Sequence, residues 1–140
     1  MIKLNRSVHD AIVAHAQRGL PHEVCGYLAE KDGRVTAHYE MTNTDAAADH
    51  FSMKPAEQFQ AARDMRDKGL KLKAVYHSHP ETPARPSVED IKLALDPAIS
   101  YVIISLAATD PAIKSFFIRD GEVSVEQITP VDDQENTEMT

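Results

Sequence analysis

The stretch that decides the fold is residues 72–90, which read LKAVYHSHPETPARPSVED. The apolar run at its start predicts a buried strand over Leu72–His79. Three prolines between Pro80 and Pro86 exclude regular structure in the next segment. Ser87 then opens a pattern that predicts a helix over Ser87–Leu95, ended by Asp96-Pro97. The stretch is therefore read as a strand, a rigid bend and a helix, with His77 and His79 where the strand ends.

Helices and strands alternate on both sides of this stretch. Ser7 and Asp10 have the spacing of an N-cap and its N3 partner, which predicts a helix over Ser7–Arg18. A second helix is predicted over Pro55–Lys68, with proline near its start and Gly69 after its end. Strands are predicted by their apolar runs and by the hairpin turns Asp32-Gly33 and Asp120-Gly121: Val24–Glu30, Val35–Met41, Tyr101–Ala107, Lys114–Ile118 and Glu122–Ile128. The order α-ββ-α-β-α-βββ favours a mixed α/β fold, with a mixed central sheet and helices packed on it.

Composition limits the class of protein. A chain of 140 residues suits one domain. Fifteen Lys and Arg against 22 Asp and Glu give a net charge of −7, which argues against binding nucleic acid through its phosphates. No stretch approaches the length of a membrane-spanning helix, and the first residues are too polar for a signal peptide. The single cysteine, Cys25, excludes a disulfide within the chain and favours a reducing, cytoplasmic location.

The acidity gathers at the end of the chain. Residues 131–140 hold Asp132, Asp133, Glu135 and Glu138 and no basic residue. This segment has no apolar pattern with which to pack. We therefore expect a single domain over residues 1–130, followed by a disordered acidic tail over residues 131–140.

The two histidines carry the chemistry. Side chains two apart on a strand point to the same face, so His77 and His79 can reach one point. Asp90, in the first turn of the following helix, can return a carboxylate to that point. Two imidazoles and a carboxylate leave a fourth position open, which is the pattern of a catalytic zinc site.

Each of these features also has a structural interpretation. A His-x-His pair alone usually has no function. Ser87 and Asp90 also have the spacing of a capping box, with serine at the N-cap and an acid at N3. The same three ligands would suit a non-haem iron oxygenase, although such enzymes normally space the carboxylate close to the first histidine. The conjunction of the histidine pair, the proline-rich bend and the polar helix start favours zinc.

These residues resemble the JAMM (MPN-type) metalloproteases. The family motif is a His-Ser/Thr-His-Pro run, six residues, and then Ser-x-x-Asp. Here His77-Ser78-His79-Pro80 is followed by six residues and by Ser87-Val88-Glu89-Asp90, with no departure in spacing. The family's upstream glutamate matches Glu23, at the start of the first predicted strand. The resemblance covers most of residues 1–130 and implies the cytidine-deaminase-like MPN fold.

The resemblance also implies roles for these residues. His77, His79 and Asp90 would bind Zn²⁺, Glu23 would accept a proton from water and deliver it to the leaving amine, and Ser87 would donate a hydrogen bond to the oxyanion. The family implies a peptidase that cuts a peptide or isopeptide bond after the C-terminal Gly-Gly tail of a ubiquitin-like or sulfur-carrier β-grasp protein. The tail could add as a strand beside a sheet edge. The small size of the chain favours a prokaryote-type member. The alternatives are an inactive scaffold of the same fold and a module that only binds a partner.

Several other residues could act at a site, but each has a simpler role. Cys25 could be a nucleophile, yet its apolar strand favours a buried, inert thiol. Asn43 could lie near the substrate channel or simply form a turn. His22 could line the cleft or lie exposed in a turn. The remaining histidines have no ligand-like spacing and are expected at the surface or satisfied in the interior: His9, His15, His38 and His50.

Overall fold

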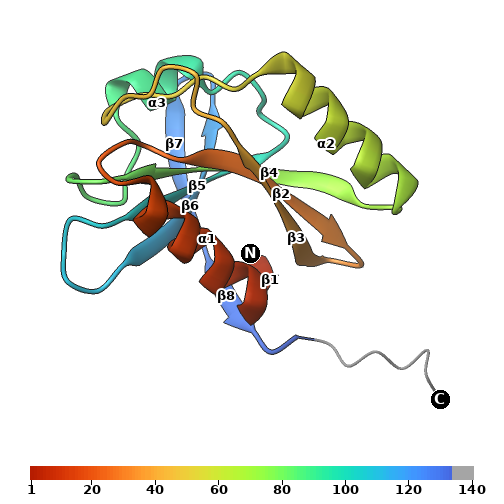
Figure 1. The fold of residues 1–140 in the computed structure, drawn as a ribbon. Helices are drawn as coiled ribbons and strands as arrows, with labels where there is room; N and C mark the ends of the chain where they lie inside the picture. Colours follow the sequence, from red (N-terminus) through yellow and green to blue (C-terminus); the bar gives the residue numbers. More distant parts are fainter. Residues whose placement is uncertain (134–140) are drawn as a thin grey trace.

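One mixed sheet runs through the computed structural model, which describes residues 1–133 (Figure 1). Its eight strands lie in the order β7-β6-β5-β4-β2-β3-β1-β8. The strands are β1 (Ile2–Asn5), β2 (Cys25–Lys31), β3 (Arg34–Met41), β4 (Lys71–His79), β5 (Ser100–Ser105), β6 (Ala112–Arg119), β7 (Glu122–Glu126) and β8 (Ile128–Val131). The helices are α1 (Arg6–Gly19), α2 (Pro55–Asp67) and α3 (Val88–Leu93). The pairs β1–β3, β1–β8 and β4–β5 are parallel and the others antiparallel, so the expected mixed α/β architecture is confirmed.

Strands β1 and β8 are absent from the predicted order. They pair with each other in parallel, from Ile2 opposite Ile128 to Asn5 opposite Val131. The predicted strand over Glu122–Ile128 is in fact β7 followed by the start of β8. Four residues are too few to establish a period-2 pattern, and each strand depends on a partner at the other end of the chain. The two ends of the described chain thus form one edge of the sheet.

The helix boundaries correct two details of the prediction. Helix α1 begins at Arg6, its N-cap Asn5 makes no side-chain capping bond, and the expected cap at Ser7 with Asp10 was wrong. Instead, the Ser7 backbone N–H donates to Asp133 Oδ1 at 3.1 Å. Helix α2 begins with Pro55, as predicted. Helix α3 ends at Leu93, two residues before the predicted end.

Both predicted hairpin turns have the backbone geometry that their sequences require. Asp32 and Gly33 have φ of 54° and 79°, and Asp120 and Gly121 have φ of 52° and 79°. Positive φ at both central residues is typical of the type I′ turn that favours Asp-Gly. These turns set the registers of β2 with β3 and of β6 with β7.

The helices cover opposite faces of the sheet. Helix α1 packs its buried Val8, Ile12 and Ala16 on one face, with Tyr76 and Ile104. Helix α2 packs on the other face, where Ala61 and Met65 meet a cluster from β2 and β3: Cys25, Ala29 and Met41. Beside this cluster lies another, with Ile91 of α3 packed against it: Ala84, Ile103, Phe116 and Ile118. Since side chains alternate along a strand, Tyr76 faces α1 whereas His77 and His79 face the side of α2 and α3.

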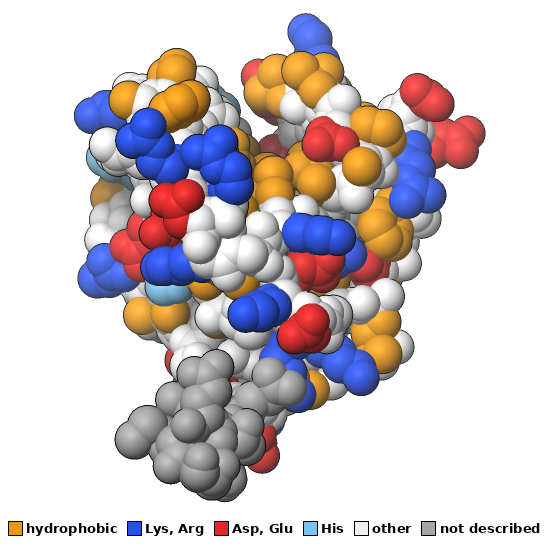
Figure 2. All heavy atoms as spheres, turned by 90° about the vertical axis from the view of Figure 1, so that its right-hand side faces the viewer, with side chains coloured by type: hydrophobic (Ala, Val, Ile, Leu, Met, Phe, Trp, Pro, Cys, Tyr) orange, Lys and Arg blue, Asp and Glu red, His pale blue; other side chains and the backbone are white. Residues whose placement is uncertain are grey.

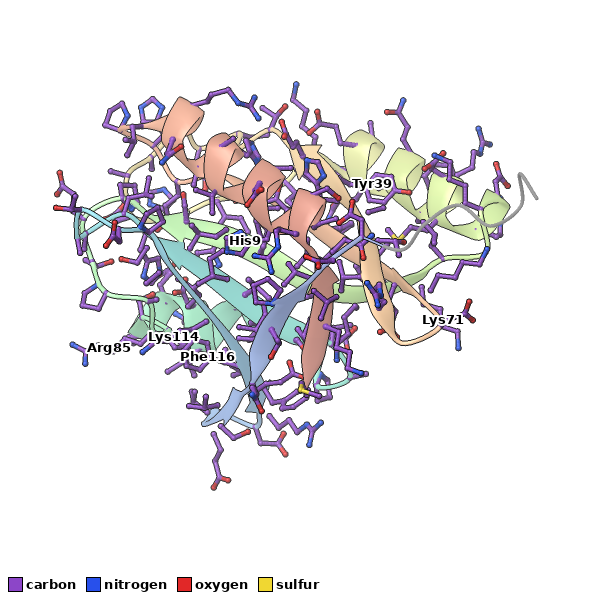
Figure 3. All side chains as sticks on the ribbon, turned by 90° about the horizontal axis from the view of Figure 1, so that it is seen from below. His9, Tyr39, Lys71, Arg85, Lys114 and Phe116 are labelled. Atoms are coloured by element: carbon purple, nitrogen blue, oxygen red, sulfur yellow. The ribbon has the colours of Figure 1, made fainter. Side chains whose placement is uncertain are left out.

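Labelled side chains help to orient these layers. Figure 3 shows Tyr39 of β3 near α2, and the Tyr39 hydroxyl donates a hydrogen bond to Asp64 of that helix at 2.5 Å. Arg85, in the proline-rich connection after β4, points away from the body of the molecule (Figure 3). That connection therefore lies at the surface, at the end of β4 where the histidines are found.

The expected acidic tail begins within the described chain. Val131 is the last residue of β8, and Asp132 accepts a hydrogen bond from Arg6 Nε at 3.2 Å. Residues 134–140, which make up the rest of the expected tail, lie outside the described residues. Within residues 1–133, no helix has both the length and the apolar character needed to cross a bilayer.

Candidate active site

Three of the predicted site residues converge at the end of β4. The Nε2 atoms of His77 and His79 lie 3.2 Å apart. Asp90 Oδ2 lies 3.1 Å from the first and 3.0 Å from the second. These three residues form a group whose ligand atoms all lie within 4.8 Å of one another. Strand β4 supplies the two imidazoles on one face, and the first turn of α3 returns the carboxylate to them.

Each imidazole also contacts a neighbour outside the group of three residues. His79 Nδ1 lies 2.9 Å from the backbone oxygen of Pro83. A carbonyl can only accept, so this nitrogen carries a proton, while Nε2 on the other edge of the ring faces Asp90 and His77. The His77 ring packs against the Phe51 ring, with centroids 5.0 Å apart. The proline-rich bend thus orients one histidine, and an aromatic ring holds the other.

Asp90 takes part in a capping box and also faces the two histidines. The Ser87 backbone N–H donates to Asp90 Oδ2, and Ser87 Oγ accepts from the Asp90 backbone N–H, each at 3.0 Å. The capping box therefore holds the Asp90 carboxylate in the position from which it faces the two histidines. Burial alone would raise the pKa of Asp90, but the hydrogen bonds from His77 and His79 outweigh it and hold the pKa well below its usual range. Asp90 is therefore ionised at neutral pH.

Glu23 lies beside this group. The β2–β4 register pairs Cys25 with His77, and it continues through a hydrogen bond from Ser78 N to Val24 O at 3.0 Å. Extended by one more residue on each strand, it brings Glu23 alongside His79. The Glu23 side chain is buried, and its Oε1 is one of two buried side-chain polar atoms without a hydrogen-bond partner among residues 1–133; the other is His77 Nδ1. Burial raises the pKa of Glu23 to about 8. When it is ionised, a buried carboxylate oxygen without a partner can accept a proton from water or from a substrate.

Ser87 lies at the exposed rim of the site. Its Oγ accepts from Asp90 N, and a hydroxyl that accepts one bond still has its own proton to donate. The serine can therefore cap the helix and donate to a bound oxygen at the same time.

A narrow cavity adjoins the three residues. It has a volume of about 40 Å³, and its lining includes His77 and Asp90 together with His50, Phe51 and Tyr101. It has room for only a few water-sized molecules, since one needs roughly 10–15 Å³. A polypeptide chain that enters so small a space needs residues with little or no side chain, and glycine has none.

A wider apolar groove leads to this cavity. Its inner part shares Phe51, Leu93 and Tyr101 with the cavity. Its outer part continues past Tyr27 and Leu72 toward Phe59 of α2. Figure 2 shows a notch in this side of the molecule with hydrophobic side chains along it. The groove thus runs over the sheet face, between α2 and the segment that follows α3.

Of the other candidate residues, Cys25, His22 and His15 do not line the cavity, whereas His50 does. Cys25 is fully buried, and burial raises the pKa of its thiol to about 12, so the expected inert thiol is confirmed. His22 is exposed, and buried His15 is satisfied by the Tyr76 hydroxyl at 2.7 Å. His50, by contrast, lines the cavity, which its position in a polar loop did not predict.

Two further residues at the site were missed because their roles depend on distant partners. Phe51 packs on His77 from the same loop as His50. Ser78, between the two histidines, is fully buried on the opposite face, where its Oγ accepts from Val24 N at 2.8 Å. Only the fact that the motif places a small hydroxyl residue there could have drawn attention to Ser78.

The donor set fits zinc. Ligands on tetrahedral zinc with bonds of roughly 2.0–2.1 Å lie about 3.3 Å apart, and the three donor atoms here are separated by 3.0–3.2 Å. The same two histidines and carboxylate also suit non-haem iron(II). The adjacent partnerless carboxylate of Glu23 favours hydrolysis over oxygen chemistry.

Two proteins of known name are similar in sequence to this chain along most of its length. The chain is 38% identical over 128 residues to the CysO-cysteine peptidase of Mycobacterium tuberculosis, a match that covers 88% of this chain and 86% of that protein. It is 33% identical over 111 residues to the desampylase of Haloferax volcanii, covering 74% and 80% of the two chains.

Solved structures and a family model also match this chain. A solution structure from Desulfitobacterium hafniense superposes with a TM-score of 0.88 at 44% identity, covering 96% of each chain. The crystal structure of a JAB1/MPN domain protein from Archaeoglobus fulgidus, at 19% identity, has the same fold, with a TM-score of 0.62 over 91% of this chain and 97% of that one. The model of the prokaryotic homologs of the JAB domain matches residues 5–119. The chain therefore belongs to the prokaryotic homologues of the JAB domain, as a small prokaryotic member of the JAMM family.

Proposed function

We propose that this chain is a zinc-dependent metallopeptidase that hydrolyses the peptide or isopeptide bond after the C-terminal Gly-Gly tail of a ubiquitin-like or sulfur-carrier β-grasp protein. Residues 1–130 would form the catalytic domain. The observation that carries the proposal is the approach of His77, His79 and Asp90 to within 3.2 Å of one another beside the buried, partnerless Glu23.

His77, His79 and Asp90 would hold the zinc. When bound, zinc polarises a carbonyl and lowers the pKa of water toward ~7. The capping box and the Pro83 carbonyl keep Asp90 and His79 aimed at the site before metal arrives, which reduces the entropy lost on binding.

Glu23 would act as general base and then as general acid. Its carboxylate accepts a proton from the attacking water and returns it to the leaving amine. Such transfer is typically worth ~10²–10⁴ in rate. A nearby divalent cation favours the ionised carboxylate and so counteracts the burial that raises the pKa of Glu23. Ser87, with its hydroxyl proton free, would donate to the oxyanion that develops on the scissile carbonyl.

The surroundings of the site favour an extended glycine tail as the substrate. Strand β4 is paired on both sides by β2 and β5, so a tail cannot add to the strand that carries the histidines. The tail would instead lie in the apolar groove on the sheet face. Its last two residues, without side chains, would enter the ≈ 40 Å³ cavity.

Sequence relatives support this class of substrate. One relative is a CysO-cysteine peptidase and another a desampylase, and this chain covers at least 80% of each. An inactive scaffold of the same fold is the alternative. It is disfavoured because all five motif residues are present: Glu23, His77, His79, Ser87 and Asp90.

The experiment combines metal analysis with a substrate panel. The chain is purified without added metal and incubated with β-grasp proteins whose Gly-Gly tails carry cysteine, a peptide or a lysine-linked protein. We expect about one zinc per chain and products cut after the second glycine, read by mass spectrometry. The matched control is each substrate with both tail glycines changed to valine. Bound iron in place of zinc, or cleavage of no panel member, contradicts the proposal.

A further inference from the structure

We propose that Asn43 is a positioning residue that fastens the loop between β3 and α2 to the backbone of Glu23, and so holds Glu23 and Phe51 in place against the two histidines. The inference rests on the proposed function, because it states that Asn43 positions Glu23, the residue proposed as general base. Nothing in the turn-like sequence around Asn43 distinguishes this role from that of an ordinary turn residue.

The Asn43 side chain uses its full hydrogen-bonding capacity. Its Nδ2 donates to the backbone oxygens of Glu23 and His50, each at 3.0 Å. Its Oδ1 accepts from the backbone N–H groups of Asp45 at 3.0 Å and Ser52 at 3.2 Å. A primary amide has two donor hydrogens and two lone pairs. All four are engaged, and each partner is a main-chain atom, so the amide fixes backbone positions.

The same loop holds Glu23 on both sides of its α-carbon. Asn43 binds the Glu23 carbonyl, and the Glu23 N–H donates to the backbone oxygen of Ala47 at 2.7 Å. Among the residues that the structure describes, none is a hydrogen-bond partner of Glu23 Oε1. The carboxyl group is therefore aimed by the backbone that carries it, which the loop holds through Asn43 and Ala47.

The second donated bond reaches the other half of the site. It fixes the carbonyl of His50, and the next residue is Phe51, whose ring packs on His77 at 5.0 Å. One side-chain amide thus links the backbone of the proposed base to the aromatic ring that supports a proposed zinc ligand.

Two substitutions separate the donated from the accepted bonds. Asn43→Asp keeps the shape and both accepted bonds, but it removes both donors and turns an oxygen toward two carbonyls. Asn43→Ala removes all four bonds. The matched control is Thr44→Val, which removes a hydrogen bond from Thr44 Oγ1 to Ser52 O in the same loop without touching Glu23 or His50.

Four quantities are measured on each variant: kcat, KM, zinc content and hydrogen exchange at the Glu23 amide. We expect Asn43→Asp and Asn43→Ala to lower kcat by about 10- to 100-fold, as small displacements of reacting groups do. We expect KM to change less than about twofold, because the outer part of the groove is lined by Tyr27, Leu72 and helix α2 and not by this loop. Zinc content should remain that of the wild type. Exchange at the Glu23 amide should accelerate, while amides in β4 and β5 keep their protection. Thr44→Val should match the wild type in all four.

The exchange measurement keeps this inference separate from the proposed function. If the wild type cleaves no substrate, the proposed function fails, and Glu23 amide exchange still decides whether Asn43 holds that backbone. Unchanged Glu23 exchange in both Asn43 variants overturns the inference. A kcat for Asn43→Asp within about twofold of that of Thr44→Val overturns it as well.

Discussion

Ser78 Oγ accepts a hydrogen bond from the backbone N–H of Val24 at 2.8 Å, on the face of the sheet opposite the site. Both residues are fully or almost fully buried. Ser78 stands between the two histidines, and Val24 follows Glu23. The bond continues the β2–β4 pairing past Cys25 and joins the segment that carries the proposed base to the strand that carries two proposed zinc ligands.

Ser78→Ala should therefore destabilise the fold and loosen the site. It leaves the buried Val24 N–H without a partner, which typically costs about 1–3 kcal/mol. We expect a fall of that size in the free energy of unfolding, measured by urea denaturation. Ser124→Ala, on the exposed strand β7, is the control and should stay within about 0.5 kcal/mol of the wild type. Equal effects of the two substitutions would show that the Ser78 bond contributes nothing to stability.

The site residues that could be predicted from sequence are those that lie close together along the chain. His77, His79 and Asp90 lie within 14 residues of one another, and strand alternation with a capping box is enough to bring them together. The missed features depend on partners far along the chain. Strand β1 needs β8, Ser78 needs Val24, and Phe51 meets His77 only after the loop folds over the sheet. Local pattern carries no information about such contacts.

Asp90→Asn should weaken metal binding without disrupting helix α3. The amide oxygen can still accept from Ser87 N, so the capping box survives, but the negative charge near the two imidazoles is lost. We expect zinc affinity to fall by more than the roughly 10–100-fold typical of losing an outer-shell partner. Competition with a chromophoric chelator measures this. Glu89→Gln, one residue earlier and exposed, is the matched control. An affinity for Asp90→Asn equal to that of the control would exclude Asp90 as a ligand.

Glu23→Gln should separate metal binding from catalysis. Glutamine keeps the size of the side chain but cannot accept a proton from water at neutral pH. We expect zinc content to stay that of the wild type and kcat to fall by about 10²–10⁴-fold. The readouts are metal analysis and steady-state cleavage of a Gly-Gly-tailed substrate. A variant that retains full activity would show that another group is the base.

The same substitution should change how the stability of the chelator-treated protein depends on pH. The pKa of Glu23 is raised from 4.5 to about 8 by burial. Between these values the folded chain retains a proton that the unfolded chain releases, so the free energy of unfolding falls as pH rises, by at most about 1.4 kcal/mol per pH unit. Above about pH 8 both states are ionised and this contribution becomes constant.

Glutamine has no such proton, so the stability of Glu23→Gln relative to the wild type should increase from about pH 5 to pH 8 and then level off. Urea denaturation of both chelator-treated proteins across this range measures the difference between their free energies of unfolding. Groups that titrate alike in the two proteins do not contribute to this difference. A difference that stays constant with pH would mean that Glu23 ionises in the folded chain as it does in the unfolded one. Such a result would place its carboxyl group in contact with water instead of in the buried position from which it is proposed to act.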